Sequence, residues 1–431
     1  MTKWFTELGE RSHMRNGNLV KRGVQLAVMS TLILVAMVAI AGCSGQEPNG
    51  PNPVILIGLD GMGWDFPEKT ETPNLDRLMA NGVRAERLVP IFPTKTFPNH
   101  YSIVTGLYAE NHGIVSNNMY DPEMDARFRL SDREAVGDGR WWGGEPIWVT
   151  AEKQGLTAAA FFWPGTESPI QGIHPTYWNE FDASIPNSER VAQVLAWLDL
   201  PQEERPAFIT LYFEDVDNAA HRWGTNHEET RAAIRTVDDA LGWLLTGLDE
   251  RGITDQVNLV VTSDHGMADI SRDRVIFLDD HVDLSDVDMI DYDPVAAIRP
   301  AAGETDAVYR ALAGAHPHLS VYKREEIPDR YHYRENPRIQ PIIGVADEGW
   351  SITTRSYFNG RPNAFTGSTH GYDNALPSMG ATFIAAGPAF KKGRTVPPFQ
   401  NVHVYELLCE VLGLTPAEND GSLDSVRVVL R

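Results

Sequence analysis

The amino-acid sequence predicts an α/β fold in which a central, mostly parallel sheet carries helices on both faces. Apolar runs of strand length alternate with segments of helical periodicity through most of the chain. Two of these runs lead into an aspartate, Asp60 and Asp264. Uninterrupted apolar strands that alternate with helices are typical of a parallel sheet buried on both faces.

The predicted elements begin with a strand over 54–59. A helix over 73–81 follows, because Thr72 can cap it, Pro73 suits the first helical position and Gly82 marks its end. A short helix is predicted over 99–106. The alternation then continues with helices over 146–153, 188–198, 229–248 and 402–412, and with strands over 157–162, 207–213, 257–262 and 381–386.

The composition is that of an ordinary globular protein. Of the 431 residues, 42% are hydrophobic and 22% charged, which argues against disorder and against a multi-span membrane protein. Residues 53–431 are interpreted as one folded domain. Within it, residues from about 270 to 365 lose the regular alternation and are rich in Pro, Tyr and Asp. We interpret this stretch as an insertion or lid that can carry a small sheet of its own.

The first 42 residues are typical of an export signal. Two basic residues, Lys21 and Arg22, precede an uncharged apolar run over 26–41, and small residues follow the run. A single N-terminal membrane anchor is the alternative, although the run is short for a helix that spans a bilayer. Export is therefore the expectation.

Cys43 makes this signal more specific. The sequence Ile40-Ala-Gly-Cys43 resembles the lipobox of bacterial lipoproteins, which implies that residues 1–42 form a lipoprotein signal peptide, that Cys43 is lipidated and that residues 43–52 are a tether. Ser44 favours the outer membrane, facing the periplasm. The second cysteine, Cys409, is then left without a partner, so the mature chain is predicted to contain no internal disulfide.

Three aspartates and three histidines stand where a sheet of this kind binds ligands, beyond the carboxyl ends of its strands or in loops bordered by small residues. They are Asp60, Asp217, His221, Asp264, His265 and His370. Asp217 and His221 are four residues apart, which places both on one face of a helical turn. Asp60 before Gly61 could by itself be a turn after a buried strand. The whole set predicts a metal centre.

A hydroxyl completes the predicted site. Thr96 lies in Phe92-Pro-Thr-Lys-Thr96-Phe-Pro, a turn bounded by prolines where a helix begins. Threonine is a weak nucleophile unless a metal or a base activates it. Six such ligands and a hydroxyl suit two metals about 3.5–4 Å apart, which clamp the attacking and leaving oxygens of a phosphoryl transfer. Imidazole and carboxylate ligands favour zinc, and manganese and iron are the alternatives.

The net charge bears on the binding partners. The formal charge is −22, and residues 1–42 contribute +3, so their removal leaves about −25. Such a charge argues against nonspecific binding to a nucleic-acid duplex. A site for anionic phosphates on so acidic a chain needs local positive charge, which divalent metals would supply. No sequence pattern indicates a protein partner.

These motifs, in their order and spacing, resemble the nucleotide pyrophosphatase/phosphodiesterase family of the alkaline phosphatase superfamily. The resemblance runs from about residue 53 to the C-terminus. It rests on Asp60, Pro93-Thr-Lys-Thr96-Phe-Pro-Asn-His-Tyr, Thr105-Gly-Leu-Tyr, His112-Gly-Ile-Val-Ser-Asn117-Asn, Phe162-Trp-Pro-Gly-Thr, Asp217 with His221, Ser263-Asp-His-Gly and His370-Gly. It implies an alkaline-phosphatase-like core with an inserted lid, and it makes residues 53–431 a phosphodiesterase catalytic domain.

The resemblance also implies a role for each matched residue. Two zinc ions are expected, one held by Asp60, Thr96, Asp264 and His265 and the other by Asp217, His221 and His370. Thr96 would attack phosphorus to give a phospho-threonyl intermediate, and Asn117 would stabilise the phosphate oxygen on which charge builds. Phe97 and Phe181 would form an aromatic slot for a nucleobase.

Some of these residues have alternative structural interpretations. Asn117 could be a loop amide that caps its own backbone, and Phe181 could belong to the core. Lys95 either assists phosphate binding or is solvated. The stretch Glu214-Asp-Val-Asp217 departs from the family's Glu-Pro-Asp while keeping the ligand spacing, and the absence of Cys-x-Pro-x-Arg excludes the sulfatases as the nearest relatives.

The expected function is a zinc-dependent hydrolase that cleaves pyrophosphate or phosphodiester bonds of nucleotides or other small phosphodiesters and releases nucleoside 5′-monophosphates. One alternative is a phosphomonoesterase or a phospholipid-headgroup phosphodiesterase on the same core. The other is a non-catalytic binding lipoprotein of the cell surface. An intact ligand set with Thr96 beside it counts against the last alternative.

Overall fold

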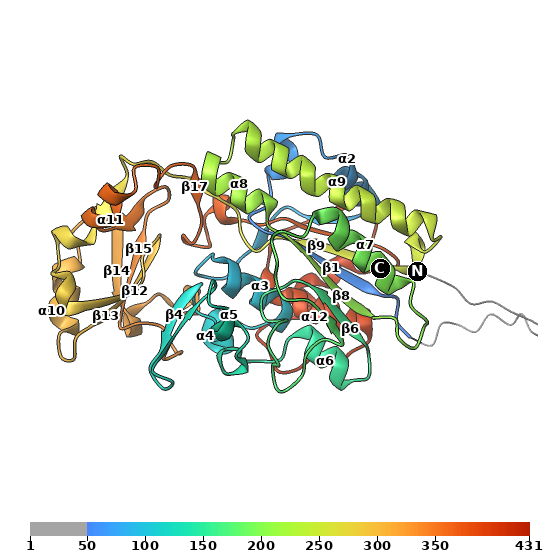
Figure 1. Ribbon diagram of the computed structural model, residues 1–431, viewed down its shortest axis with the longest axis horizontal. Coiled ribbons are helices and arrows are strands. Elements are labelled where there is room, and N and C mark those ends of the chain that lie inside the picture. Colours follow the sequence, from blue (N-terminus) through green and yellow to red (C-terminus); the bar gives the residue numbers. More distant parts are fainter. Residues whose placement is uncertain (1–49) are drawn as a thin grey trace, which may run out of the picture. The chain divides into compact units, whose positions relative to one another are not determined.

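Strand β1 (Val54–Leu59) is the centre of the fold. The computed structural model describes residues 50–431, so the predicted signal peptide, Cys43 and most of the tether lie outside the described residues. β1 pairs in parallel with β8 (Phe208–Phe213) on one side and with β9 (Asn258–Thr262) on the other. These three strands are apolar runs that the sequence predicted, and they form the middle of an eight-stranded sheet (Figure 1).

The outer strands make this sheet mixed. Its order is β19-β2-β18-β9-β1-β8-β6-β7. Strands β6 (Ala158–Phe161) and β7 (Tyr177–Trp178) extend the parallel side. On the other side, β18 (Phe383–Ala386) runs antiparallel to β9 and to β2 (Gly82–Ala85), and β19 (Arg394–Val396) pairs in parallel with β2. The predicted α/β fold with a mostly parallel sheet is confirmed.

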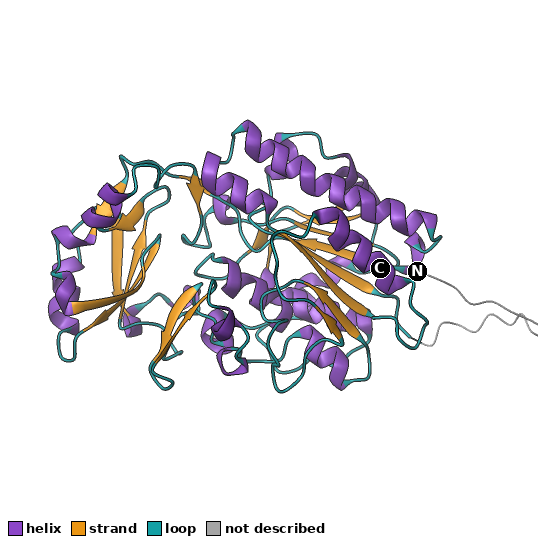
Figure 2. Cartoon of the chain, in the orientation of Figure 1, coloured by secondary structure: helices purple, strands orange, loops and turns teal. Residues whose placement is uncertain are grey.

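Helices cover both faces of the sheet (Figures 1 and 2). One face carries α2 (Pro73–Asn81), α7 (Asn187–Leu198) and α9 (Glu228–Glu250), and the other carries α3 (Thr96–Thr105), α6 (Ile147–Lys153) and α12 (Val404–Leu412). Side chains alternate along β1, so Ile55 and Ile57 join the first core and Val54 and Leu56 the second. Every β1 residue is buried because each face has a core of its own.

Helix α3 begins three residues earlier than the predicted 99–106. It starts at Thr96, and Asn99 stabilises this start because its amide donates to the carbonyl oxygens of Pro93 at 3.0 Å and of Lys95 at 2.9 Å. Pro98 is tolerated in the first turn, where backbone N–H groups have no partner within the helix. The hydroxyl predicted to be the nucleophile therefore stands at the N-terminus of α3.

The other elements of the core are short. Helix α8 (Asp215–Trp223) follows β8 directly. The rest are α4 (Ala109–His112), α5 (Arg133–Val136) and α13 (Leu423–Val426), with the strand pairs β3 (Leu88–Val89) and β20 (Phe399–Gln400), β4 (Asn118–Asp121) and β5 (Ala126–Arg129), and β10 (Ala268–Asp269) and β17 (Ser368–Thr369). One further short pair, β11 (Val275–Phe277) and β16 (Ser351–Thr353), lies in the insert. Within residues 50–431, no helix is both long and apolar enough to cross a membrane.

The insert, residues 270–365, has a sheet and a core of its own, at the left of Figure 1. Four antiparallel strands pair in the order β12-β13-β15-β14, namely β12 (Val287–Asp291), β13 (Val295–Pro300), β14 (Leu319–Lys323) and β15 (Ile342–Ala346). Helix α10 (Thr305–Leu312) joins the core of this sheet through Val308 and Leu312, and α11 (Arg355–Gly360) follows β16. The chain leaves β12 at Asp291, which lies beside the turn that carries Thr96.

Candidate active site

Three neighbouring strands deliver three carboxylates to one edge of the sheet. Asp60 follows β1, Asp264 follows β9, and Asp217 lies in the first turn of α8 after β8. The backbone N–H of Gly61 donates to Asp264 at 3.1 Å. Gly61 has φ +67°, and a β-carbon there would lie 2.9 Å from the α-carbon of Asp217, so only glycine lets the two loops approach this closely.

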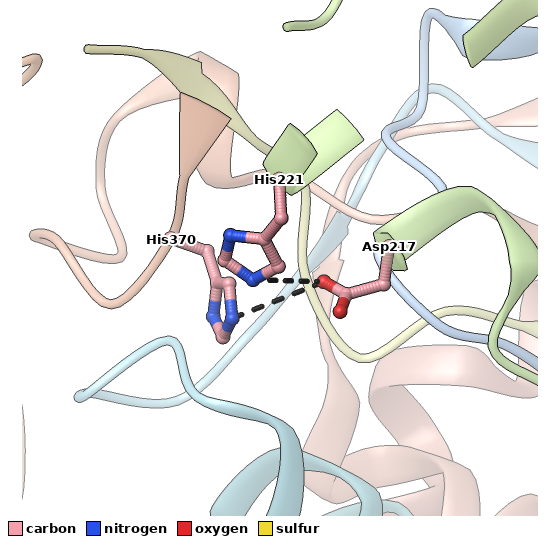
Figure 3. Close-up of side chains that lie close together, drawn as sticks. All are labelled: Asp217, His221 and His370. Carbon is pink, nitrogen blue, oxygen red and sulfur yellow. Dashed lines mark ion pairs between the residues drawn. The ribbon is translucent and has the colours of Figure 1, made fainter. Parts of the chain in front are cut away.

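All six predicted ligands occur in three overlapping groups at this edge, and within each group the ligand atoms lie within 4.8 Å of one another. One group joins Asp217, His221 and His370, and a second joins Asp60, Asp217 and His265. The third joins Asp60 and Asp264 with His100. Figure 3 shows the first group, with Asp217 Oδ1 3.4 Å from His221 Nε2 and 3.9 Å from His370 Nε2. In the second group, His265 Nε2 lies 3.6 Å from Asp60 Oδ1. These spacings leave room for an ion between the side chains.

Backbone carbonyls orient the three imidazoles. The Nδ1 atoms of His221, His265 and His370 lie 2.9, 3.1 and 2.7 Å from the carbonyl oxygens of Ser368, Gly266 and Thr94, respectively. An Nδ1–H that donates to a carbonyl leaves the Nε2 lone pair free, which is the arrangement of metal-binding histidines. All three Nε2 atoms face the carboxylates, so the donor set fits divalent metal ions.

The electrostatics of the site also fit bound cations. Asp60 Oδ1 and Asp217 Oδ1 are buried and have no hydrogen-bond partner, an expensive state for a carboxylate unless a cation offsets it. Burial, together with the nearby charges of Asp264 and Asp217, raises the pKa of Asp60 well above its usual value. Burial, with His265 and His221 beside it, lowers the pKa of His370 well below its usual value, which keeps this imidazole neutral.

Thr96 and Thr94 occupy the same turn but have different surroundings. The hydroxyl of Thr96 lies 3.5 Å from His265 Nε2, and Thr96 lines a cavity of about 480 Å³. Thr94 is fully buried, its hydroxyl donates to the carbonyl of Tyr372 and accepts from the N–H of Gly371, and its carbonyl accepts from His370. Thr94 thus fastens the turn to the His370 loop, and Thr96 is the hydroxyl that faces the predicted ligands.

Asn117 lines the same cavity in a fixed orientation. Its side-chain oxygen accepts a hydrogen bond from the backbone N–H of Phe97 at 2.9 Å. The amide nitrogen is then the polar end of Asn117 that is left to donate into the cavity. A donor placed beside Thr96 in this way can stabilise charge on a phosphate oxygen.

The two predicted aromatic residues line this cavity as well. Phe97 is half-buried and packs against Phe128 and Trp142, with ring centroids 5.9 and 6.0 Å away. Phe181 is 38% exposed and meets the ring of Phe162 edge-on at 5.1 Å. The structure therefore brings Phe97 and Phe181 to the cavity that contains Thr96, with apolar surface on both.

Lys95 is buried in an ion pair and does not line this cavity. It is 5% exposed, and its Nζ lies 2.5 Å from Asp291 Oδ2 at the end of β12. Ser116 donates to the same carboxylate oxygen at 2.6 Å. The ammonium charge of Lys95 is thus paired with the insert, and Lys95 is absent from the residues that line the cavity. Its predicted role in phosphate binding stays a prediction.

Two further residues, which the sequence did not single out as functional, support the ligands. The hydroxyl of Tyr212 donates to Asp60 Oδ2 at 2.5 Å, and His100 Nδ1 lies 3.3 Å from Asp264 Oδ2. Tyr212 reaches Asp60 because β8 pairs with β1 in the register that sets Tyr212 opposite Gly58. This register is not readable from the sequence. The one available signal for His100 was its place four residues after Thr96, one helical turn away.

Comparisons with known proteins agree with this geometry. Residues 54–373 match the family model described as type I phosphodiesterase / nucleotide pyrophosphatase. Human ectonucleotide pyrophosphatase/phosphodiesterase family member 5 is 40% identical over 378 residues, which cover 88% of this chain and 78% of that protein. A bis(5′-adenosyl)-triphosphatase of Xenopus laevis is 39% identical over 402 residues, covering 92% of this chain and 86% of that one.

Solved structures of two such proteins are also similar to this chain. The murine ectonucleotide pyrophosphatase / phosphodiesterase 5, as an inactive variant in complex with AMP, superimposes with a TM-score of 0.84 at 41% identity, covering 88% of this chain and 100% of that chain. The human counterpart gives a TM-score of 0.84 at 40% identity. The predicted ligands and strands β1, β8 and β9 lie within residues 54–373, which the family model matches.

Proposed function

Because the chain belongs to the type I phosphodiesterase / nucleotide pyrophosphatase family of hydrolases, we propose that it cleaves nucleotide pyrophosphate and phosphodiester bonds and releases nucleoside 5′-monophosphates. The observation that carries this proposal is that one cavity at the sheet edge brings these residues together. Thr96, Asn117, Phe97 and Phe181 line it, and so do the predicted ligands Asp60, Asp217, His221 and His370. A nucleophile, an oxyanion donor, a base slot and cation ligands would thus act on one substrate.

The family is metal-dependent, and we propose two zinc ions for this chain. Asp60, Asp264 and Thr96, whose side-chain oxygens all lie near His265 Nε2, would hold one ion together with His265. Asp217, His221 and His370 would hold the other. Bound there, the ions would offset the buried carboxylates and increase the nucleophilicity of the hydroxyl. The remaining steps belong to the chain's own residues.

We propose that the Thr96 hydroxyl oxygen attacks phosphorus. A bond forms between Oγ1 and phosphorus as the bond to the leaving oxygen breaks, the hydroxyl proton is lost to water, and the 5′-nucleotide is left on Thr96. Asn117 donates to the non-bridging oxygen while charge builds there, a contribution typically worth about 10²–10³ in rate. Water then hydrolyses the phospho-threonyl ester and releases the nucleoside 5′-monophosphate.

The charges around the cavity favour diesters over monoesters. Among the described residues, the arginine that lines the cavity, Arg133, is paired with Glu167, and Glu214 at the cavity wall is held by Arg190, at 2.7 Å. A monoester dianion would therefore meet no unpaired arginine, the side chain best suited to it. A diester carries one negative charge at phosphorus and offers a second substituent for the aromatic slot.

The test of this proposal compares matched substrates on one preparation of residues 53–431. We expect kcat/KM for an aryl diester of a nucleotide to exceed that for the aryl monoester by several orders of magnitude, and ATP to yield AMP and pyrophosphate. Phe97→Ala should reduce kcat/KM for nucleotides more than for small aryl diesters, because only nucleotides stack a base on it. A higher kcat/KM for the monoester, or ADP and orthophosphate from ATP, would favour the phosphomonoesterase alternative.

We also propose that the protein is an exported lipoprotein held in a membrane by acyl chains on Cys43. Cys43→Ala should then move the protein from the membrane fraction to the soluble periplasmic fraction, because acyl chains rather than a helix provide the anchor. The measurement is cell fractionation with mass spectrometry of the N-terminus. An uncleaved N-terminus and continued membrane retention of this variant would support the alternative of a single N-terminal anchor.

A further inference from the structure

A carboxylate of the insert contacts both chain segments that carry the proposed catalytic residues. Asp291 stands at the end of β12, and Figure 1 shows this strand beside β4, which begins directly after Asn117. Asp291 Oδ2 lies 2.5 Å from Lys95 Nζ and accepts a hydrogen bond from the Ser116 hydroxyl at 2.6 Å. One carboxylate oxygen therefore joins two segments of the core.

The two partners of Asp291 are the sequence neighbours of Thr96 and Asn117. Lys95 precedes Thr96 at the start of α3, and Ser116 precedes Asn117 in the loop before β4. A bond to one residue restrains the backbone of the next, because successive α-carbons are only about 3.8 Å apart. Asp291 can thus hold the backbone beneath both side chains, although it does not line the cavity that contains them.

Charge and burial make the contact of Asp291 firm. The side chains of Lys95 and Asp291 are 6% and 11% exposed, and within residues 50–431 neither forms another ion pair. Hydrogen bonds between ionised groups are stronger than those between neutral groups, and salt screens them little when they are buried. Asn118 Nδ2 also lies 3.4 Å from Asp291 Oδ1, so the carboxylate meets residues on both sides of Asn117.

The strand and turn that present Asp291 are themselves anchored. The pairing of β12 with β13 shifts by one residue just before Asp291, which marks a bulge, and a bulge re-aims the side chain beside it. Beyond it, Asp293 accepts from the backbone N–H of Ile352 at 2.8 Å. Pro294 lies so close to Gly371 that a β-carbon on this glycine would stand 2.6 Å from the proline ring. The turn therefore presents the carboxylate in a fixed position.

We propose that Asp291 is a positioning residue, which fixes the Asn117 loop relative to the Thr96 turn through Lys95 and Ser116. The nucleophile and the donor to the phosphate oxygen act on one phosphoryl group at the same moment. A displacement of about 1 Å between them can lower the rate by about 100-fold. This inference rests on the proposed function, which assigns the chemistry of Thr96 and Asn117.

The first test replaces the carboxylate by an amide of the same shape. Asp291→Asn should lower kcat and kcat/KM for the nitrophenyl ester of AMP together, by about 10–100-fold, and leave KM within about 3-fold of the wild-type value. Only the transition state is weakened, since the aromatic slot and the predicted ligands keep their places. Metal content, which should equal that of the wild type, and thermal unfolding are determined on the same samples.

Asp121→Asn is the matched control. Asp121 forms an ion pair with Arg338 of the insert at 2.7 Å, their side chains are 7% and 12% exposed, and neither residue lines the cavity. This substitution also removes a buried charge that joins the insert to the core, but Asp121 is bonded to no neighbour of Thr96 or Asn117. It should lower the temperature of unfolding about as much as Asp291→Asn, with kcat within about 3-fold of the wild-type value.

A double-mutant cycle separates positioning from loss of stability. In the Asn117→Ala background no donor remains to be misplaced, and Thr94 still fastens the Thr96 turn to the His370 loop. Asp291→Asn should therefore lower kcat by less than about 3-fold in that background. A purely structural effect would lower kcat by the same factor in both backgrounds.

Ser116→Ala tests the same contact with a smaller change. It keeps the ion pair of Asp291 and removes the bond to the Asn117 loop, so kcat should fall by about 3–10-fold. Ser102→Ala is its control, a buried serine of α3 whose hydroxyl lies 3.0 Å from His112 Nε2, and kcat should stay at the wild-type value. If Asp291→Asn did not fold, Ser116→Ala would decide, and an unchanged kcat would overturn the inference.

The outcomes distinguish this inference from the proposed function. If the wild-type enzyme hydrolyses the ester and Asp291→Asn matches Asp121→Asn in kcat, or lowers kcat equally in both backgrounds, the role of Asp291 alone is overturned. Failure of the wild-type, metal-loaded enzyme to hydrolyse the ester would overturn the proposed function and this inference with it.

Discussion

Thr96→Ala is expected to abolish hydrolysis of a nucleotide diester while leaving the fold and most metal binding intact. The substitution removes the hydroxyl that lies 3.5 Å from His265 Nε2 and only one member of the ligand set. Loss of a covalent nucleophile typically lowers kcat by a factor on the order of 10⁴–10⁶. The measurement is kcat for the nitrophenyl ester of AMP, with metal content and thermal unfolding determined on the same samples.

Thr94→Ala is the matched control in the same turn. Its hydroxyl bonds Tyr372 and Gly371 and does not line the cavity. Loss of these buried hydrogen bonds should lower the free energy of unfolding by about 1–3 kcal/mol, with a smaller effect on kcat than Thr96→Ala. If Thr96→Ala kept the wild-type kcat and Thr94→Ala were inactive, the nucleophile would be wrongly assigned.

Removal of metal is expected to inactivate the enzyme and to destabilise it. Asp60 Oδ1 and Asp217 Oδ1 are buried without partners, so a chelator would leave their charges uncompensated. Activity should return with added zinc. The temperature of unfolding should also fall on chelation, because a ligand present at 1,000 times its Kd stabilises the native state by about 4 kcal/mol.

Single ligand variants should separate the two proposed ions. His221→Ala or His370→Ala leaves one group a ligand short, so elemental analysis should find about half of the wild-type metal. His318→Ala is the control, because His318 lies in the insert beside Asp347 and outside every ligand group. One metal ion or none per wild-type chain would contradict the two-metal centre.

The parts of the fold that the sequence predicted share one property. Strands β1, β8 and β9 are buried on both faces, so their composition shows in the sequence as unbroken apolar runs. The carboxylates beyond them could be grouped without knowing the strand order, since the carboxyl ends of parallel strands meet at one edge. The insert gave no such signal, because its four strands pair antiparallel and several are only half-buried.

The details of the site that the sequence did not predict depend on the register of strand pairing, on where a helix begins and on the partner that a side chain reaches. The reach of Tyr212 to Asp60 depends on the pairing of β8 with β1, and the contact of His100 with Asp264 depends on α3 starting at Thr96. The contact of Lys95 could not be predicted from the sequence either. Its place beside the nucleophile is visible in the sequence, but its ammonium points to Asp291, 196 residues later in the chain.

Strand β1 also separates the point where the described chain enters the sheet from the point where the predicted ligands begin. The carbonyl of Pro53 accepts from Asn258 where the strand begins, and Asp60 follows where it ends. Six extended residues at about 3.3 Å each separate these points by roughly 20 Å. The described chain therefore enters the sheet at the end of β1 opposite to the end that carries the predicted ligands. The polarity of a single strand thus separates the entry of the chain from the cavity that contains Thr96.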